Sequence, residues 1–139
     1  MSAEHKTPYP TLPHGIHHKI VKKVLPEWTL ANFDPLLPPV LSTPNMIGLM
    51  ESAAATAAKP HLSDGMITVG TRIEVDHLKA VTTGATVEVN AHLVAQEGRF
   101  LTFEVEARSG SHVIGRGKVF RAIVEPRSFQ TRATARGNS

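Results

Sequence analysis

A single carboxylate stands in an otherwise apolar helical segment. The stretch "STPNMIGLMESAAATAAKP", residues 42–60, contains Glu51 as its only acid. On a helical wheel Glu51 falls at the edge of the apolar face, where a helix glutamate is most often solvated and does no chemistry. The same place suits a base at the wall of a pocket. The spacing alone leaves both interpretations open.

Three more residues could work with such a carboxylate. His77 ends a predicted strand on the face expected to meet the helix, although a lone histidine there is more often a packed core residue. Gly70 lies inside the same strand, where glycine indicates a bulge or a close approach that exposes a backbone N–H. Thr43 is predicted to cap the helix, and that helix end would also favour a developing oxyanion.

The helix that carries Glu51 is the clearest element of the sequence. It is expected to begin at Thr43 as N-cap, with Pro44 in the first turn, and to stop at Pro60. One face collects apolar side chains at helical spacing: Met46, Leu49, Met50, Ala53, Ala54 and Ala57. The many alanines on this face indicate that another element approaches closely, as a curved sheet would.

Alternating apolar and polar residues predict four strands after the helix. They fall in residues 66–78, 85–96, 99–108 and 111–126, and Glu-Gly and Ser-Gly turns join the last three into a meander. Residues 14–25 allow a first strand before the helix. One helix and one antiparallel sheet of five strands predict a two-layer α+β domain, and the element order resembles the hotdog fold, in which the sheet wraps around the helix.

The remaining segments are irregular. Residues 1–13 are expected to form an N-terminal arm, residues 14–129 the domain, and residues 130–139 a flexible tail. Between the first strand and the helix, residues 26–43 contain Pro26, Pro35, Pro38 and Pro39 among apolar side chains. This proline-stiffened loop is either a lid or pocket wall, or a loop packed over the core.

Composition excludes several classes of function. The 139 residues are 41% hydrophobic and 19% charged with a formal charge of +3, and contain no cysteine, which excludes disulfides, zinc-thiolate sites and cysteine nucleophiles. No basic stripe with interleaved aromatics indicates nucleic-acid binding, and no apolar run suits a membrane span. With no recognisable signal peptide, a cytoplasmic protein is expected. His14, His17 and His18 would not converge on a strand, so no metal or other cofactor is expected.

Three motifs, in register with the predicted elements, resemble the fluoroacetyl-CoA thioesterase-like family of hotdog thioesterases. The family's T-x-x-M-x-G-L-M-E segment appears at residues 43–51, its G-T-x-[IV]-x-V-x-H strand at residues 70–77, and its G-x-G-x-x-x-R-A-[IV] strand at residues 115–123. The resemblance extends from about residue 14 to residue 129.

The resemblance implies hydrolysis of an acyl-CoA thioester by Thr43, Glu51 and His77. Glu51 would attack the carbonyl or activate a water, and His77 would orient or protonate the reacting groups. Thr43 would hydrogen-bond Glu51 or the substrate, and the Gly70 N–H would donate to the oxyanion. Arg121 would lie near the acyl group or the Glu51 network, unless it is a surface arginine of the last strand.

The acyl pocket implied by the resemblance would include Asn45, Phe33 and Leu37. Asn45 replaces a bulky apolar residue, and Leu37 takes the place of an aromatic at the expected gate. Fluoroacetyl selectivity is therefore not implied, and a small or medium acyl group is expected. Pro44 has no N–H to donate at the helix start.

The resemblance also implies a homodimer with sites shared between protomers. Cations for the CoA phosphates are available at Lys79, Arg99, Arg116 and Lys118, and the sequence does not choose among them. One alternative function is a non-catalytic domain that binds or senses acyl-CoA. Another, a hotdog hydratase acting on enoyl thioesters, would need an aspartate–histidine motif that is not found.

Overall fold

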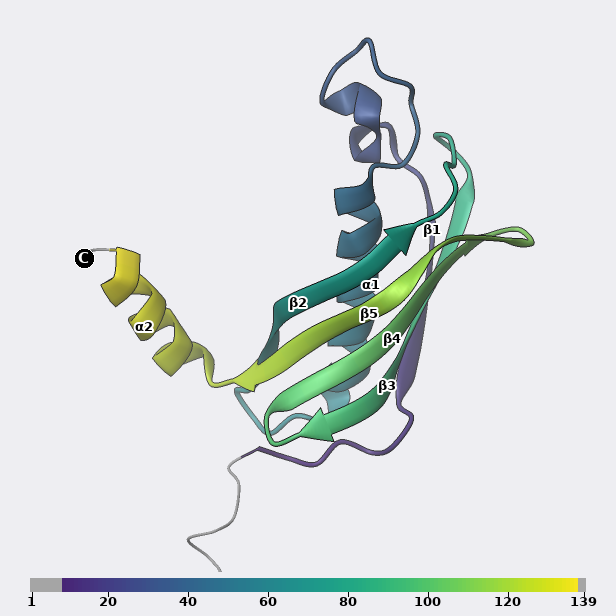
Figure 1. The fold of residues 1–139 in the computed structure, drawn as a ribbon. Coiled ribbons are helices and arrows are strands. Elements are labelled where there is room, and N and C mark those ends of the chain that lie inside the picture. Colours follow the sequence, from purple (N-terminus) through teal and green to yellow (C-terminus); the bar gives the residue numbers. More distant parts are fainter. Residues whose placement is uncertain (1–8, 138–139) are drawn as a thin grey trace, which may run out of the picture.

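One long helix packs against one face of a five-stranded antiparallel sheet (Figure 1). The computed structural model describes residues 9–137. The strands are β1 (His17–Lys23), β2 (Ile67–His77), β3 (Thr86–Glu97), β4 (Phe100–Ser109) and β5 (His112–Val124), in the spatial order β1-β3-β4-β5-β2. The long helix is α1 (Thr43–Ala58) and a second helix, α2 (Pro126–Gly137), ends the chain. The predicted α+β class and the β3–β4–β5 meander are confirmed.

The core lies between α1 and the central strands. The inward positions of β3 and β4 are buried and alternate with polar residues: Val87, Val89, Ala91, Leu93, Leu101, Phe103, Val105 and Ala107. They face the buried side of α1, where Met46 and Met50 supply bulk and the alanines let the sheet come close. At Gly115 a Cβ atom would lie 2.5 Å from the Met46 Sδ, so this strand glycine allows β5 to pack on the helix.

The N-cap of α1 is Ser42, so the prediction of Thr43 as cap is wrong by one position. The Ser42 Oγ accepts a hydrogen bond from the Asn45 backbone N–H at 3.3 Å. Ser42 has the extended backbone of an N-cap, which places its short side chain back over the first turn. The Thr43 hydroxyl is therefore not needed for capping.

The proline-rich loop is folded back over the N-terminal end of α1. It contains two short 3-10 helices, η2 (Pro26–Trp28) and η3 (Leu30–Asn32), and is held by backbone hydrogen bonds from Ser42 N to Trp28 O and from Leu41 N to Val81 O. Its tip leaves Phe33 and Leu36 largely exposed, whereas Leu41 is buried. The two ends of the loop are thus fixed by backbone hydrogen bonds, whereas its tip is apolar and faces solvent.

The edge strand β2 is covered less than the sequence predicts. Ile67 and Ile73, two apolar residues of its alternating pattern, are 42% and 38% exposed. The register with β5 shifts between Gly70 and Arg72, which marks a bulge. In the described part of the chain, β2 pairs with β5 on one side only, so its other edge offers unpaired backbone groups.

The described residues at both ends of the chain lie outside the sheet. The Gln96 side chain binds the backbone of Pro10 and Leu12, and Leu12 is buried; residues 1–8 of the predicted arm lie outside the described residues. Where a flexible tail was expected, α2 stands away from the sheet with no buried residue (Figure 1). Its start is capped by Glu125, and the backbone N–H groups of Ser128 and Arg127 lower the pKa of that carboxyl.

No helix within residues 9–137 is long and apolar enough to span a membrane.

Candidate active site

A threonine and a histidine meet at the N-terminal end of α1. Thr43 is the first residue of the helix and His77 the last residue of β2. The Thr43 Oγ1 lies 2.7 Å from the His77 Nδ1, in hydrogen-bond contact. The other ring nitrogen, Nε2, is buried and has no hydrogen-bond partner among residues 9–137. One nitrogen thus fixes the ring, and the second keeps its capacity to bind or move a proton.

A cavity of about 280 Å³ lies beside this pair. Its lining is mostly apolar: Leu30, Val40, Leu41, Thr43, His77, Leu78, Lys79 and Ala80. Leu30, Val40 and Leu41 of the proline-rich loop therefore form part of its wall, which agrees with one of the two interpretations of that loop. The volume suits a small group with a few polar contacts.

The carboxylate of Glu51 is held by a buried arginine. The Arg121 Nη1 donates to the Glu51 Oε1 at 3.1 Å, and the Arg121 side chain is 9% exposed against 31% for Glu51. Thr68 fixes the guanidinium in turn, because Arg121 Nε donates to the Thr68 Oγ1 at 2.9 Å and Nη2 to the Thr68 carbonyl at 3.0 Å. The arginine is therefore buried and not a surface residue, and it fixes the glutamate in one position.

Glycine at position 70 makes room for that carboxylate. A Cβ atom at Gly70 would lie 2.6 Å from the Glu51 Oε2 and 2.9 Å from Oε1. The close approach expected at this strand glycine is thus made by Glu51, at the bulge of β2. The Glu51 carboxylate therefore packs against the Gly70 backbone, and one of its oxygens accepts a hydrogen bond from Arg121.

The two pairs are far apart within one chain. Glu51 follows Thr43 by eight residues, which is about 12 Å along a helix. Gly70 precedes His77 by seven residues of β2, or about 24 Å along a strand. One chain therefore brings Thr43 to His77 and Glu51 to Gly70 and Arg121, but it does not bring all three predicted catalytic residues together.

The chain matches a family model described as fluoroacetyl-CoA-specific thioesterase, FlK, over residues 24–127. It is also 39% identical, over 116 residues, to the fluoroacetyl-CoA thioesterase of Streptantibioticus cattleyicolor, covering 83% of this chain and 81% of that protein. The chain belongs to this family. The resemblance predicted from the three motifs is confirmed.

Solved structures that are similar to this chain show that it has the hotdog fold. The fluoroacetyl-CoA thioesterase FlK superposes with a TM-score of 0.85 at 33% identity, over 90% of this chain and 97% of that chain. A variant of FlK in complex with fluoroacetate and CoA gives 0.77 at 35% identity, over 85% and 99%. A hot-dog-like protein from Thermanaerovibrio acidaminovorans, at 24% identity, shares the fold with a TM-score of 0.80 over 98% and 97%.

Within one chain, the three residues expected in the acyl pocket do not line the cavity beside His77. Asn45 supports the helix cap, because its Nδ2 donates to the Ser42 Oγ at 2.6 Å. Phe33 and Leu37 are 65% and 41% exposed, and neither lines the cavity beside His77. A role for them in substrate binding stays a prediction.

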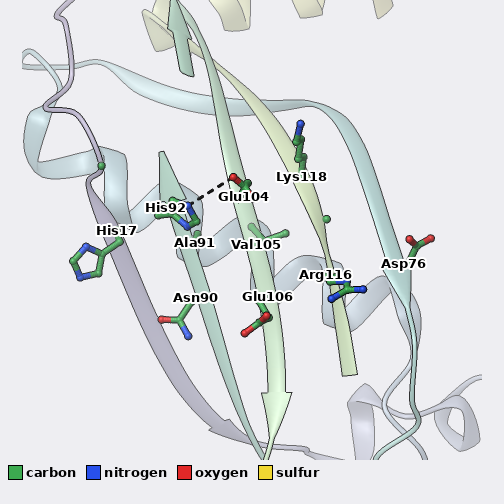
Figure 2. Close-up of a pocket in the computed structure, with 12 residues that line it drawn as sticks. His17, Asp76, Asn90, Ala91, His92, Glu104, Val105, Glu106, Arg116 and Lys118 are labelled. Carbon is green, nitrogen blue, oxygen red and sulfur yellow. Dashed lines mark ion pairs between the residues drawn. The ribbon is translucent and has the colours of Figure 1, made fainter. Parts of the chain in front are cut away.

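A second, larger groove of about 760 Å³ lies on the outer face of the sheet (Figure 2). Polar and charged residues of its lining are His17, Asp76, Asn90, His92, Glu104, Glu106, Arg116 and Lys118. None of the predicted catalytic, oxyanion or acyl-pocket residues lines it, but Arg116 and Lys118, two of the four candidate cations for the CoA phosphates, do. No group of three metal-binding side chains gathers anywhere in residues 9–137.

Proposed function

We propose that this protein hydrolyses acyl-CoA thioesters to a carboxylic acid and free CoA. The observation that carries the proposal is the Glu51 carboxylate, fixed by buried Arg121 against the backbone of Gly70. A positioned carboxylate can act on a thioester carbonyl, and the Thr43–His77 pair offers a group for the proton. Membership of a thioesterase family supports the same reaction.

Two routes fit the carboxylate. In one, Glu51 takes a proton from water, and the hydroxide adds to the carbonyl carbon while the C–S bond breaks. In the other, Glu51 adds directly, the thiolate leaves, and water then cleaves the mixed anhydride. In both, His77 would deliver a proton to the leaving thiolate and the Gly70 N–H would stabilise the oxyanion. The net reaction consumes one water and gives the acid and CoA.

The proposal includes a homodimer that completes the site. Two β2 strands paired antiparallel about a two-fold axis between Ile73 and Glu74 would bring Gly70 of one copy opposite residue 77 of the other. Opposed residues in such a pair point to the same face. The Glu51 carboxylate at Gly70 would then meet the Thr43–His77 pair of the second copy.

Features of β2 support this pairing. Its outer edge is unpaired in the described chain, and Ile67 and Ile73 on it are exposed. A long edge strand with exposed apolar side chains favours pairing with another strand. The proposed location, the cytoplasm, rests on the sequence alone.

Thiol release from a panel of acyl-CoA esters tests the function. We expect turnover of small and medium acyl groups, because the cavity beside His77 is about 280 Å³, and lower rates for long chains. Saturable binding of the esters without thiol release would contradict the proposal and favour a non-catalytic acyl-CoA-binding domain. Loss of enoyl absorbance from crotonyl-CoA without release of thiol would instead indicate a hydratase.

A further inference from the structure

Two of the four candidate cations for CoA phosphates are flanked by acids on the outer face of the sheet. The cross-strand neighbours are Asp76 and Glu106 beside Arg116, and Glu74 and Glu104 beside Lys118. Arg116, Lys118, Asp76 and both β4 glutamates project into the outer groove (Figure 2). Carboxylates on both sides oppose the binding of another anion there.

A third candidate cation, Arg99, lies at the end of the sheet opposite to the His77 of its own chain. The guanidinium of Arg99 lies 4.9 Å from the centroid of the Phe100 ring, and its carbonyl accepts from Ile123 N. Ile123 is eight residues along β5 from Gly115, the partner of His77, or about 27 Å. Within one chain Arg99 is therefore remote from the cavity beside His77, and its guanidinium is held over the Phe100 ring.

Lys79 differs from all three, because it lines the cavity that Thr43 and His77 line. Its backbone is tied to β5 by hydrogen bonds from Leu78 N and Lys79 N to the Ile114 carbonyl, at 2.7 and 3.2 Å. No carboxylate of residues 9–137 lies within ion-pair distance of its ammonium group. The Lys79 Nζ instead lies 3.3 Å from the His112 Nδ1.

The chemistry of this contact assigns the histidine proton. A lysine ammonium can only donate, so the His112 Nδ1 must accept and the ring proton lies on Nε2. Both side chains are exposed. Lys79 retains two further N–H groups and His112 one, so the pair can offer several donors and a positive charge to one anion.

We infer that Lys79 and His112 bind a phosphate group of the CoA moiety at the mouth of the cavity beside His77. The choice of CoA as ligand rests on the proposed function. Lys79 follows His77 by two residues, at most about 7 Å of extended chain before the side chain begins. The phosphates of CoA are separated from its thiol by the pantetheine arm, so an anion site outside the reacting centre suits them.

Binding of CoA, 3′-dephospho-CoA and pantetheine tests the inference without any turnover. The affinities of wild type, Lys79→Ala and the matched control Lys118→Ala are measured by calorimetry, and by NMR titration for the weakly bound pantetheine. We expect Lys79→Ala to weaken CoA binding about tenfold and to leave pantetheine binding unchanged, because only a charge-assisted contact to phosphate is lost. Lys118→Ala should change the CoA affinity less than about twofold.

The dephospho ligand identifies the phosphate. If the loss in affinity caused by Lys79→Ala disappears with 3′-dephospho-CoA, Lys79 binds the 3′-phosphate, and if the loss persists with 3′-dephospho-CoA, Lys79 binds the diphosphate; both results support the site. Unchanged CoA affinity in Lys79→Ala, an equal loss for pantetheine, an equal effect of Lys118→Ala, or no CoA binding by the wild type would overturn it. Absence of thiol release with an intact Lys79 effect overturns only the thioesterase, and normal thiol release with no Lys79 effect overturns only this site.

Discussion

Replacing Glu51 by glutamine is expected to lower kcat for acyl-CoA hydrolysis about a thousandfold. The amide can neither take the proton of a water nor attack the carbonyl. Its oxygen can still accept the hydrogen bond that Arg121 now donates to the Glu51 Oε1 at 3.1 Å. The side chain keeps its size and its place against Gly70, so the change removes the chemistry of the carboxylate and little else.

Thiol release measures this effect, and a matched charge deletion controls for it. Glu106 lies on the outer face of the sheet, opposite the face that carries α1 and Glu51, and pairs with Arg108 at 2.7 Å. Glu106→Gln therefore also removes one carboxylate from an ion pair, but it should leave kcat within about twofold. Equal rates for Glu51→Gln and the wild type, in folded protein, would show that Glu51 has no part in the reaction.

Adding a methyl group at Gly70 is expected to reduce kcat about a hundredfold while the protein stays folded. The new Cβ would lie 2.6 Å from the Glu51 Oε2, so the carboxylate has to move away from its position on the strand. The displaced atoms end a flexible side chain, so the structure can adapt at small cost in stability. A shift of about 1 Å in a reacting group is enough for such a loss in rate.

The control for Gly70→Ala is Gly48→Ala on α1. A Cβ at Gly48 meets no atom within 4 Å, and alanine in a helix is favoured over glycine by about 0.5–1 kcal/mol. This variant should keep the wild-type kcat with an unchanged or higher melting temperature. Full activity in Gly70→Ala would mean that the position of the Glu51 carboxylate is not important for the rate.

Much of the fold could be predicted because it is set by local patterns. Alternation in residues 85–124 and the turns at Gly98 and Gly110 predict β3, β4 and β5 and their pairing. The exposure of Ile67 and Ile73 could not be predicted, because it depends on β2 being an edge strand, which only the sheet order determines. The helix α2 was not predicted. None of its residues is buried, so the segment has no apolar face, and only the capping residue and the helix propensities of its residues indicate a helix.

The residues of the candidate site were easier to predict than their contacts. Glu51 is conspicuous as one acid in an apolar helix, and His77 as a strand-end histidine. Thr68 was missed, since its role depends entirely on where the Arg121 guanidinium lies across the β2–β5 pair. Lys79 could not be selected from the four candidate cations for the CoA phosphates either. That selection requires the positions of the cations in the fold and the residues beside each of them.

The central claim is that Glu51 of one copy works with Thr43 and His77 of the other. Mixed dimers of Glu51→Gln and His77→Ala chains, co-expressed with different tags and isolated through both, test it directly by thiol release. Each homodimer of a variant has two damaged sites, whereas a mixed dimer would keep one site with both residues intact. We predict about half the wild-type activity in the mixed dimer and almost none in either parent; mixed dimers as inactive as their parents would contradict the shared site.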